Sequence, residues 1–96
     1  MALATVFLAP MDTQIAFYRA DPLAVVEWLI KGDQYKKIGT LITEQEGEAA
    51  AEDLFDLSNN PSREDERAIK WGANRSLSVG DVVSVDGVSW ACLPTC

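Results

Sequence analysis

Histidine is absent from the 96 residues of this chain, and this absence excludes more chemistry than any other feature of its composition. Serine–histidine catalysis, cysteine–histidine catalysis and metal sites built on imidazole cannot be formed by this chain alone. The phosphate-cradling motifs G-x-x-x-x-G-K and G-x-G-x-x-G are also missing. The sequence therefore predicts a protein that is not an enzyme, with no catalytic residue, no metal and no cofactor.

Cysteine occurs only twice, as Cys92 and Cys96, in a C-x-x-x-C spacing interrupted by Pro94. A zinc site would need two more thiolate or imidazole ligands, and a redox pair would have C-x-x-C at a helix start. Two cysteines are too few for a disulfide scaffold, so we expect a reducing compartment. We interpret Cys92 as a small apolar strand residue and Cys96 as an incidental thiol.

Long apolar runs are also missing. No segment approaches the roughly 20 apolar residues of a membrane span. The apolar run at residues 3–9 is short and follows no basic stretch, so it does not resemble a signal peptide. These observations predict a cytoplasmic protein that does not enter a membrane.

Basic residues are few, since eight Lys and Arg face fifteen Asp and Glu, for a net charge of −7. This balance argues against direct binding to nucleic acid or to an anionic membrane. The acids are concentrated in residues 44–66, where nine acidic residues and one basic residue give −8, so the rest of the chain sums to +1. The protein is nearly neutral apart from one strongly acidic segment.

Two interpretations of this segment stay open. It is either a solvated surface that keeps a small protein soluble or a docking face for a basic partner, such as a protein that normally holds DNA or RNA. Exposed helix acids lack the apolar pocket that raises a catalytic pKa, and no calcium-loop pattern is present. The acidic candidates for partner binding are Glu48, Glu52, Asp53, Asp56, Glu64 and Asp65.

Short apolar runs rich in β-branched and aromatic residues predict the strands of the first half. Residues 3–9 form one and residues 35–43 another, with a bulge at Gly39. Residues 13–18 are either a further strand or an irregular approach to the next helix.

Two main helices are predicted from capping signals. Asp21-Pro22 starts a helix that reaches about residue 31 and ends before Gly32. The capping box Thr43-x-x-Glu46 starts a second that reaches about Leu57. The first helix is expected to bury Leu23, Val26, Trp28, Leu29 and Ile30, and the second Ala50, Ala51, Leu54, Phe55 and Leu57.

The second half continues with a short third helix at residues 63–71, capped by Ser62. Asp86-Gly87 favours a type I′ turn, so residues 79–85 and 88–93 are expected to pair as a hairpin, with Trp90 in the core. The whole chain, residues 1–96, is predicted to be one α+β domain, with an antiparallel or mixed sheet, two main helices on one face and a C-terminal hairpin. An exposed edge strand would also permit a homodimer.

The order of several pieces resembles small YodL-like accessory proteins, which are carried by phages, plasmids and integrative elements. The matching pieces are residues 35–43, Leu57-Ser58-Asn59, Trp71, and Arg75-Ser76-Leu77-Ser78-Val79-Gly80-Asp81. The resemblance covers residues 35–93, and the aromatic-glycine ending usual after this hairpin is missing. It implies a mobile-element origin and a bacterial cytoplasm, and it supplies no catalytic residues.

Trp71 and Arg75 complete the candidate partner-binding residues. Trp71 lies between Lys70 and Gly72 in a predicted loop, where it is either a binding hot spot or a plug for the sheet. Arg75 is expected to contact a partner or to bond a helix carboxylate.

The leading hypothesis is a non-enzymatic inhibitor of a host defence system, such as CRISPR interference or restriction, that occupies a basic nucleic-acid-binding surface. The alternatives are an accessory domain with no inhibitory role and a small-ligand-binding regulator near Trp71.

Overall fold

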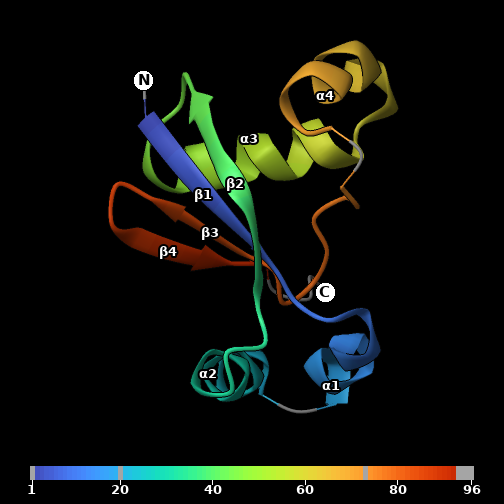
Figure 1. The fold of residues 1–96 in the computed structure, drawn as a ribbon, viewed down its shortest axis with the longest axis vertical. Coiled ribbons are helices and arrows are strands. Elements are labelled where there is room, and N and C mark those ends of the chain that lie inside the picture. Colours follow the sequence, from blue (N-terminus) through green and yellow to red (C-terminus); the bar gives the residue numbers. More distant parts are fainter. Residues whose placement is uncertain (1, 20, 73, 93–96) are drawn as a thin grey trace.

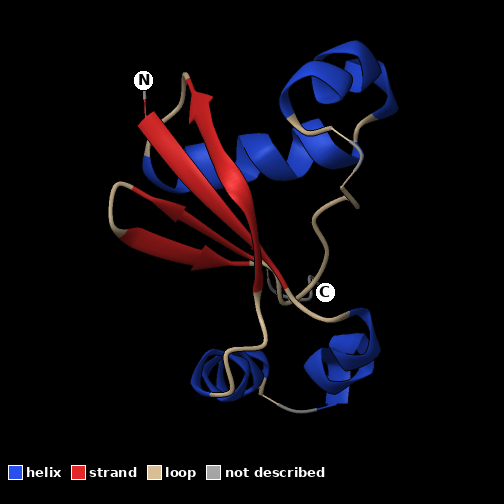
Figure 2. Ribbon diagram, viewed as in Figure 1, coloured by secondary structure: helices blue, strands red, loops and turns tan. Residues whose placement is uncertain are grey.

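A four-stranded antiparallel sheet organises the part of the chain that this computed structural model describes, residues 2–19, 21–72 and 74–92 (Figure 1). In Figure 2 the longest helix crosses behind the strands, and two helices lie beyond the lower end of the sheet. The elements are β1 (Ala2–Leu8), α1 (Gln14–Arg19), α2 (Pro22–Lys31), β2 (Lys36–Thr43), α3 (Gly47–Asn59), α4 (Glu64–Lys70), β3 (Val82–Val85) and β4 (Val88–Ala91). Short 3-10 turns at Met11–Thr13 and Pro61–Arg63 precede α1 and α4. The predicted α+β class is confirmed.

The strand order is β2-β1-β3-β4, and every neighbouring pair is antiparallel. The most apolar strand, β1, is therefore interior, while β2 and β4 form the edges. Val6 pairs with Gly39 and Phe7 with Lys37, which leaves Ile38 as an extra residue. This shift confirms the predicted bulge next to Gly39.

The C-terminal hairpin is confirmed with shorter strands than predicted. Asp86 and Gly87 both have positive φ, 49° and 86°, as a type I′ turn requires. Before the hairpin, Gly80 adopts a φ of 90° and the amide of Asp81 donates to the carbonyl of Ser78. This turn delays the start of β3 to Val82, and the predicted end at Leu93 lies outside the described residues.

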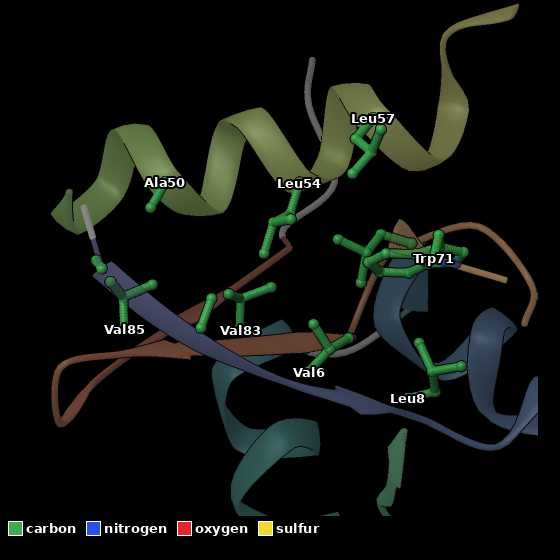
Figure 3. Packing of buried hydrophobic residues seen from close by; sticks show 11 residues of the cluster. Val6, Leu8, Ala50, Leu54, Leu57, Trp71, Val83 and Val85 are labelled. Atoms are coloured by element: carbon green, nitrogen blue, oxygen red, sulfur yellow. The ribbon is translucent and has the colours of Figure 1, made fainter. Parts of the chain in front are cut away.

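The larger core lies between the sheet and α3 (Figure 3). Alternate residues of β1 point toward α3 because successive side chains of a strand face opposite sides. Leu54 and Leu57 descend from α3 onto this surface, and Trp71 closes one end of it. The buried members are Ala2, Ala4, Val6, Leu8, Ala50, Leu54, Leu57, Trp71, Leu77, Val83 and Val85.

A second, smaller core joins α1 and α2 to the opposite face of the sheet. It contains Phe17, Val26, Leu29 and Val82, with Phe7 packed against it. Phe7 and Val82 alternate with Val6 and Val83, so they face away from α3. The expectation that both main helices cover one face is thereby corrected.

Residues 13–18 are helical rather than extended. Both edges of β1 are already paired, with β2 and with β3, so no partner remains beside it for another strand. The hydroxyl of Thr13 donates to the carbonyl of Pro10 at 2.6 Å, and the helix buries Phe17 alone.

The buried stripe of α2 is narrower than predicted. Val26 and Leu29 are buried, but Leu23, Ile30 and Trp28 are exposed, Trp28 by 68%. The helix packs chiefly against α1, which has six residues, so a short partner covers only one line of side chains. The predicted core role of Trp28 is therefore wrong.

The predicted start of α3 at Thr43 is also wrong. Thr43 is the last residue of β2, and its buried side chain accepts a hydrogen bond from the amide of Gln45 at 3.2 Å. The helix begins at Gly47, and its expected apolar residue Phe55 is 41% exposed. The turn before α4 is capped by Asn60, whose side chain accepts from the amide of Ser62, rather than by Ser62 itself.

A substitution at Gly80 tests how closely the turn before the hairpin packs against α1. A Cβ at this position would clash with the ring of Phe17, and the positive φ disfavours any L side chain. We expect Gly80→Ala to lower the free energy of unfolding by about 2–4 kcal/mol, measured by urea denaturation. Gly87→Ala is the matched control, because Gly87 has a similar φ but open space around its Cβ. Equal losses in the two variants would contradict the packing at Phe17.

Candidate functional site

Part of the acidic segment is neutralised by one arginine. The guanidinium of Arg63 donates to Asp53 and Asp56 of α3 at 2.9 Å each, and to both carboxylate oxygens of Glu66 in α4, also at 2.9 Å. Lys70 donates to the same Glu66 at 3.2 Å. This ion cluster fastens α4 to α3.

The cluster changes the ionisation of its members. The hydrogen bonds from Arg63, and then from Lys70, lower the pKa of Glu66 to about 2. Its three carboxylate partners raise the pKa of Arg63. Because Asp53 and Asp56 share the positive charge of Arg63, they are tied to the fold. Their contact with a partner stays a prediction, in which the partner would meet them as members of an ion cluster rather than as free carboxylates.

The other predicted acids stay directed to solvent. Glu48 and Glu52 are exposed on α3, and Glu64 and Asp65 are exposed in the first turn of α4. None of the four makes an ion pair within the described part of the chain. These carboxylates are among those of the acidic segment that a basic partner can reach.

Trp71 is buried, with 3% of its surface exposed. Its indole Nε1 donates to the carbonyl of Arg75 at 2.9 Å, and its ring belongs to the larger core. Of the two interpretations of Trp71, the structure supports the one in which its side chain closes one end of the core beside the sheet. The hot-spot interpretation is corrected, since a buried ring offers a partner or a small ligand almost no surface.

Arg75 bonds Asp81 rather than a helix carboxylate. Its two terminal nitrogens donate to the two carboxylate oxygens at 2.7 and 2.8 Å, and one also donates to the carbonyl of Ala9 at 2.5 Å. Asp81 has a fully buried side chain and also accepts from the amides of Ala9 and Ser78, each at 2.7 Å. The predicted partner-binding role of Arg75 is corrected, because this side chain is used within the fold.

A groove of about 770 Å³ lies between α3 and the hairpin, and it was not predicted from the sequence. One wall is a helical stripe of α3 that starts with the acids Glu48 and Glu52 and continues with Phe55. The other wall includes Trp90 of β4. The remaining lining residues are Tyr18, Ala51, Asn59, Leu77, Ser78, Val79, Asp81, Val83, Ala91 and Cys92.

The only signal for this groove was Phe55, which the helical pattern placed in the core. Phe55 lies one helical turn after Ala51 and lines the groove with it. The helical spacing of these apolar residues predicted burial, but Phe55 forms part of the groove wall instead. A second set of exposed apolar residues was missed because residues 13–18 were not predicted to be helical. Met11, Ile15 and Tyr18 follow one another at helical spacing, yet each is more than 60% exposed.

One thiol, that of Cys92, lines the groove. Burial, and then the charge of Asp81, raises the pKa of the Cys92 thiol to about 11, so this thiol is protonated and weakly nucleophilic near neutral pH. Within residues 2–19, 21–72 and 74–92, no three His, Cys, Asp or Glu side chains are grouped as metal ligands.

Comparison with protein-family models, with curated proteins and with solved structures gives no match for this chain. The resemblance to YodL-like proteins therefore stays a prediction. None of the described helices has the length and apolar character needed to cross a bilayer.

Asp81→Asn tests the buried ion pair. The change keeps the shape of the side chain but removes the negative charge that compensates Arg75. It would also place an amide NH2 against the hydrogen-bond donors that now bond the carboxylate. We expect the free energy of unfolding to fall by about 3–5 kcal/mol in urea denaturation. Asp86→Asn makes the same chemical change at an exposed turn of the same hairpin and should stay within about 0.5 kcal/mol of wild type. Similar values for both variants would contradict the structural role of Asp81.

The alkylation rate of the Cys92 thiol at different pH values tests its burial at the end of the hairpin. In a Cys96→Ser background, we expect iodoacetamide to alkylate Cys92 at pH 8 about 10- to 100-fold more slowly in the folded protein than in urea, because the raised pKa keeps the thiol protonated. The folded rate should rise as the pH approaches 11, as followed by mass spectrometry. Equal rates in the folded and unfolded states would place the thiol in open solvent instead.

Proposed function

We propose that this chain is a non-enzymatic protein-binding factor whose acidic α3–α4 surface occupies a basic surface of another protein. The observation that carries the proposal is the separation of the acids into two groups. Asp53, Asp56 and Glu66 are held by Arg63, while Glu48, Glu52, Glu64 and Asp65 remain exposed around them.

The ion cluster favours recognition because it fixes the two helices that carry the exposed carboxylates. A charged surface that is already ordered loses less conformational freedom on binding than a flexible acidic tail. Such a surface also accelerates encounter with a positively charged partner and competes with phosphates for the same cationic groups.

The partner class is a basic host protein that normally binds nucleic acid. Together with the resemblance to proteins of phages and mobile elements, this favours inhibition of a bacterial defence system in the host cytoplasm, such as CRISPR interference or restriction. The chain itself would not bind nucleic acid, since its net charge is −7. The alternative is an accessory domain whose exposed acids serve solubility alone. We do not propose a regulator that binds a small ligand near Trp71, because the Trp71 side chain is buried.

Paired charge reversals test the proposal. We expect E48K/E52K and E64K/D65K each to reduce capture of basic proteins from a bacterial host lysate and to reduce rescue of phage plating in cells with an active defence system. Capture by wild type should weaken as salt rises from about 0.1 to 0.5 M, because exposed charges are screened within about 10 Å.

D12K/E27K is the matched control, since it changes the net charge equally but lies on the turn before α1 and on α2, where both residues are exposed. It should behave as wild type in both assays. If all three double variants retain capture and plating rescue, the acidic surface serves solubility alone. Circular dichroism checks that each variant is folded.

A further inference from the structure

The edge of β4 is the starting point, because an edge strand presents backbone groups that no neighbour uses. Val85 and Val88 flank the two-residue turn and form a hydrogen-bonded pair, so the pairs alternate from there along the hairpin. The bond from the Cys92 amide to the Asp81 carbonyl, at 2.8 Å, follows the same alternation. Ser89 and Ala91 therefore direct their N–H and C=O groups away from β3.

The groove lies directly beside this edge. Trp90 pairs with Val83, so its side chain lies on the face of the sheet that α3 covers. Together with the α3 stripe, it makes a channel between a helix and an edge strand. An extended peptide added to β4 would place every second side chain in this channel, as in recognition by strand addition.

Trp90 also has an unmet hydrogen bond. Its indole Nε1 is buried and finds no hydrogen-bond partner among the described residues. A buried donor without an acceptor costs free energy, so such a group in a native structure calls for a partner. Because the Trp90 ring lines the groove, a rotation of the indole would bring this donor to a carbonyl or hydroxyl oxygen of a bound peptide.

Charge decides between the occupants that this channel could take. Glu48 and Glu52 stand on its α3 wall and favour a lysine or arginine among the inserted side chains. A second copy pairing through its own β4, with the sequence VSWA, brings no basic residue to these glutamates. The chain's own last residues, LPTC, bring none either.

We propose that the groove between α3 and β4 binds an extended peptide segment of the partner protein, with basic and apolar side chains in the channel and its backbone paired to Ser89 and Ala91. This inference rests on the proposed function, because it uses Glu48 and Glu52 of the same acidic surface. It adds that part of the recognition is a β-strand pairing that buries apolar side chains.

The peptide acetyl-KTLTVTK-amide is a suitable probe, since in either strand direction it presents two apolar residues flanked by two lysines to the groove. Titrated into the 15N-labelled full chain, it should shift the indole N–H of Trp90 and the backbone amides of Ser89 and Ala91. The counterpart acetyl-ETLTVTE-amide should bind at least about tenfold more weakly, which corresponds to about 1.4 kcal/mol.

Variants separate the strand pairing from the charge. Ser89→Pro removes an outward N–H without removing a bond to β3, and we expect it to weaken the lysine peptide about tenfold, while Ser89→Thr keeps the N–H and the affinity. E48K/E52K should also weaken binding and leaves the hairpin untouched, so the test holds even if Ser89→Pro unfolds.

E64K/D65K distinguishes this inference from the proposed function. It should leave the affinity for the lysine peptide unchanged while it reduces capture of the basic protein. Loss of capture in all acidic variants without any peptide binding would overturn the groove proposal and leave the proposed function standing.

Other results would also overturn the groove proposal. These are equal binding of the two peptides, peptide binding only after deletion of residues 93–96, and a concentration-dependent dimer in sedimentation that excludes the peptide. The second would assign the channel to the chain's own end, and the third to another copy.

Discussion

The carboxylate of Asp81 is the interaction on which both halves of the structure depend. It is fully buried and receives hydrogen bonds from Arg75 and from the amides of Ala9 and Ser78. It thereby joins the end of β1, the loop after α4 and the turn before β3. The carbonyl of Arg75 in the same loop accepts a hydrogen bond from the indole of Trp71. The buried charge of Asp81 therefore also helps to position Trp71 at the end of the larger core. A buried carboxylate requires such partners, since a charge removed from water without compensating hydrogen bonds costs free energy.

The turn that Asp81 stabilises also joins the two cores. Gly80 packs under Phe17 of α1, and its carbonyl accepts from the hydroxyl of Tyr35 at 2.6 Å. Val82 then faces the smaller core and Val83 the larger one. A short strand with apolar residues on both faces can connect two helix layers only if its register is fixed, and the Asp81 network fixes where that strand begins.

The acidic segment shows how one charge pattern can serve two purposes. Arg63 forms ion pairs with three carboxylates of the segment and thereby joins α4 to α3. The other acids of the segment remain exposed to solvent. The proposed docking surface and the groove share Glu48 and Glu52, so long-range attraction and close contact would act at one place. The neutral edge of β4 and the buried Trp90 would then supply the short-range recognition that charge alone lacks.

Local signals in the sequence determined the α+β class, the start of α2 at Pro22, the bulge at Gly39 and the Asp86-Gly87 turn, because each depends on the backbone preferences of neighbouring residues. The sequence also determined the concentration of acids in residues 44–66. Only the tertiary structure decided that residues 13–18 are helical, that Trp28 is exposed and Trp71 buried, and that Arg63 and Arg75 bind the carboxylates they do. Periodicity marks an apolar side chain, but which surface covers it depends on elements distant in the chain. Burial and ion pairing are therefore decided by packing.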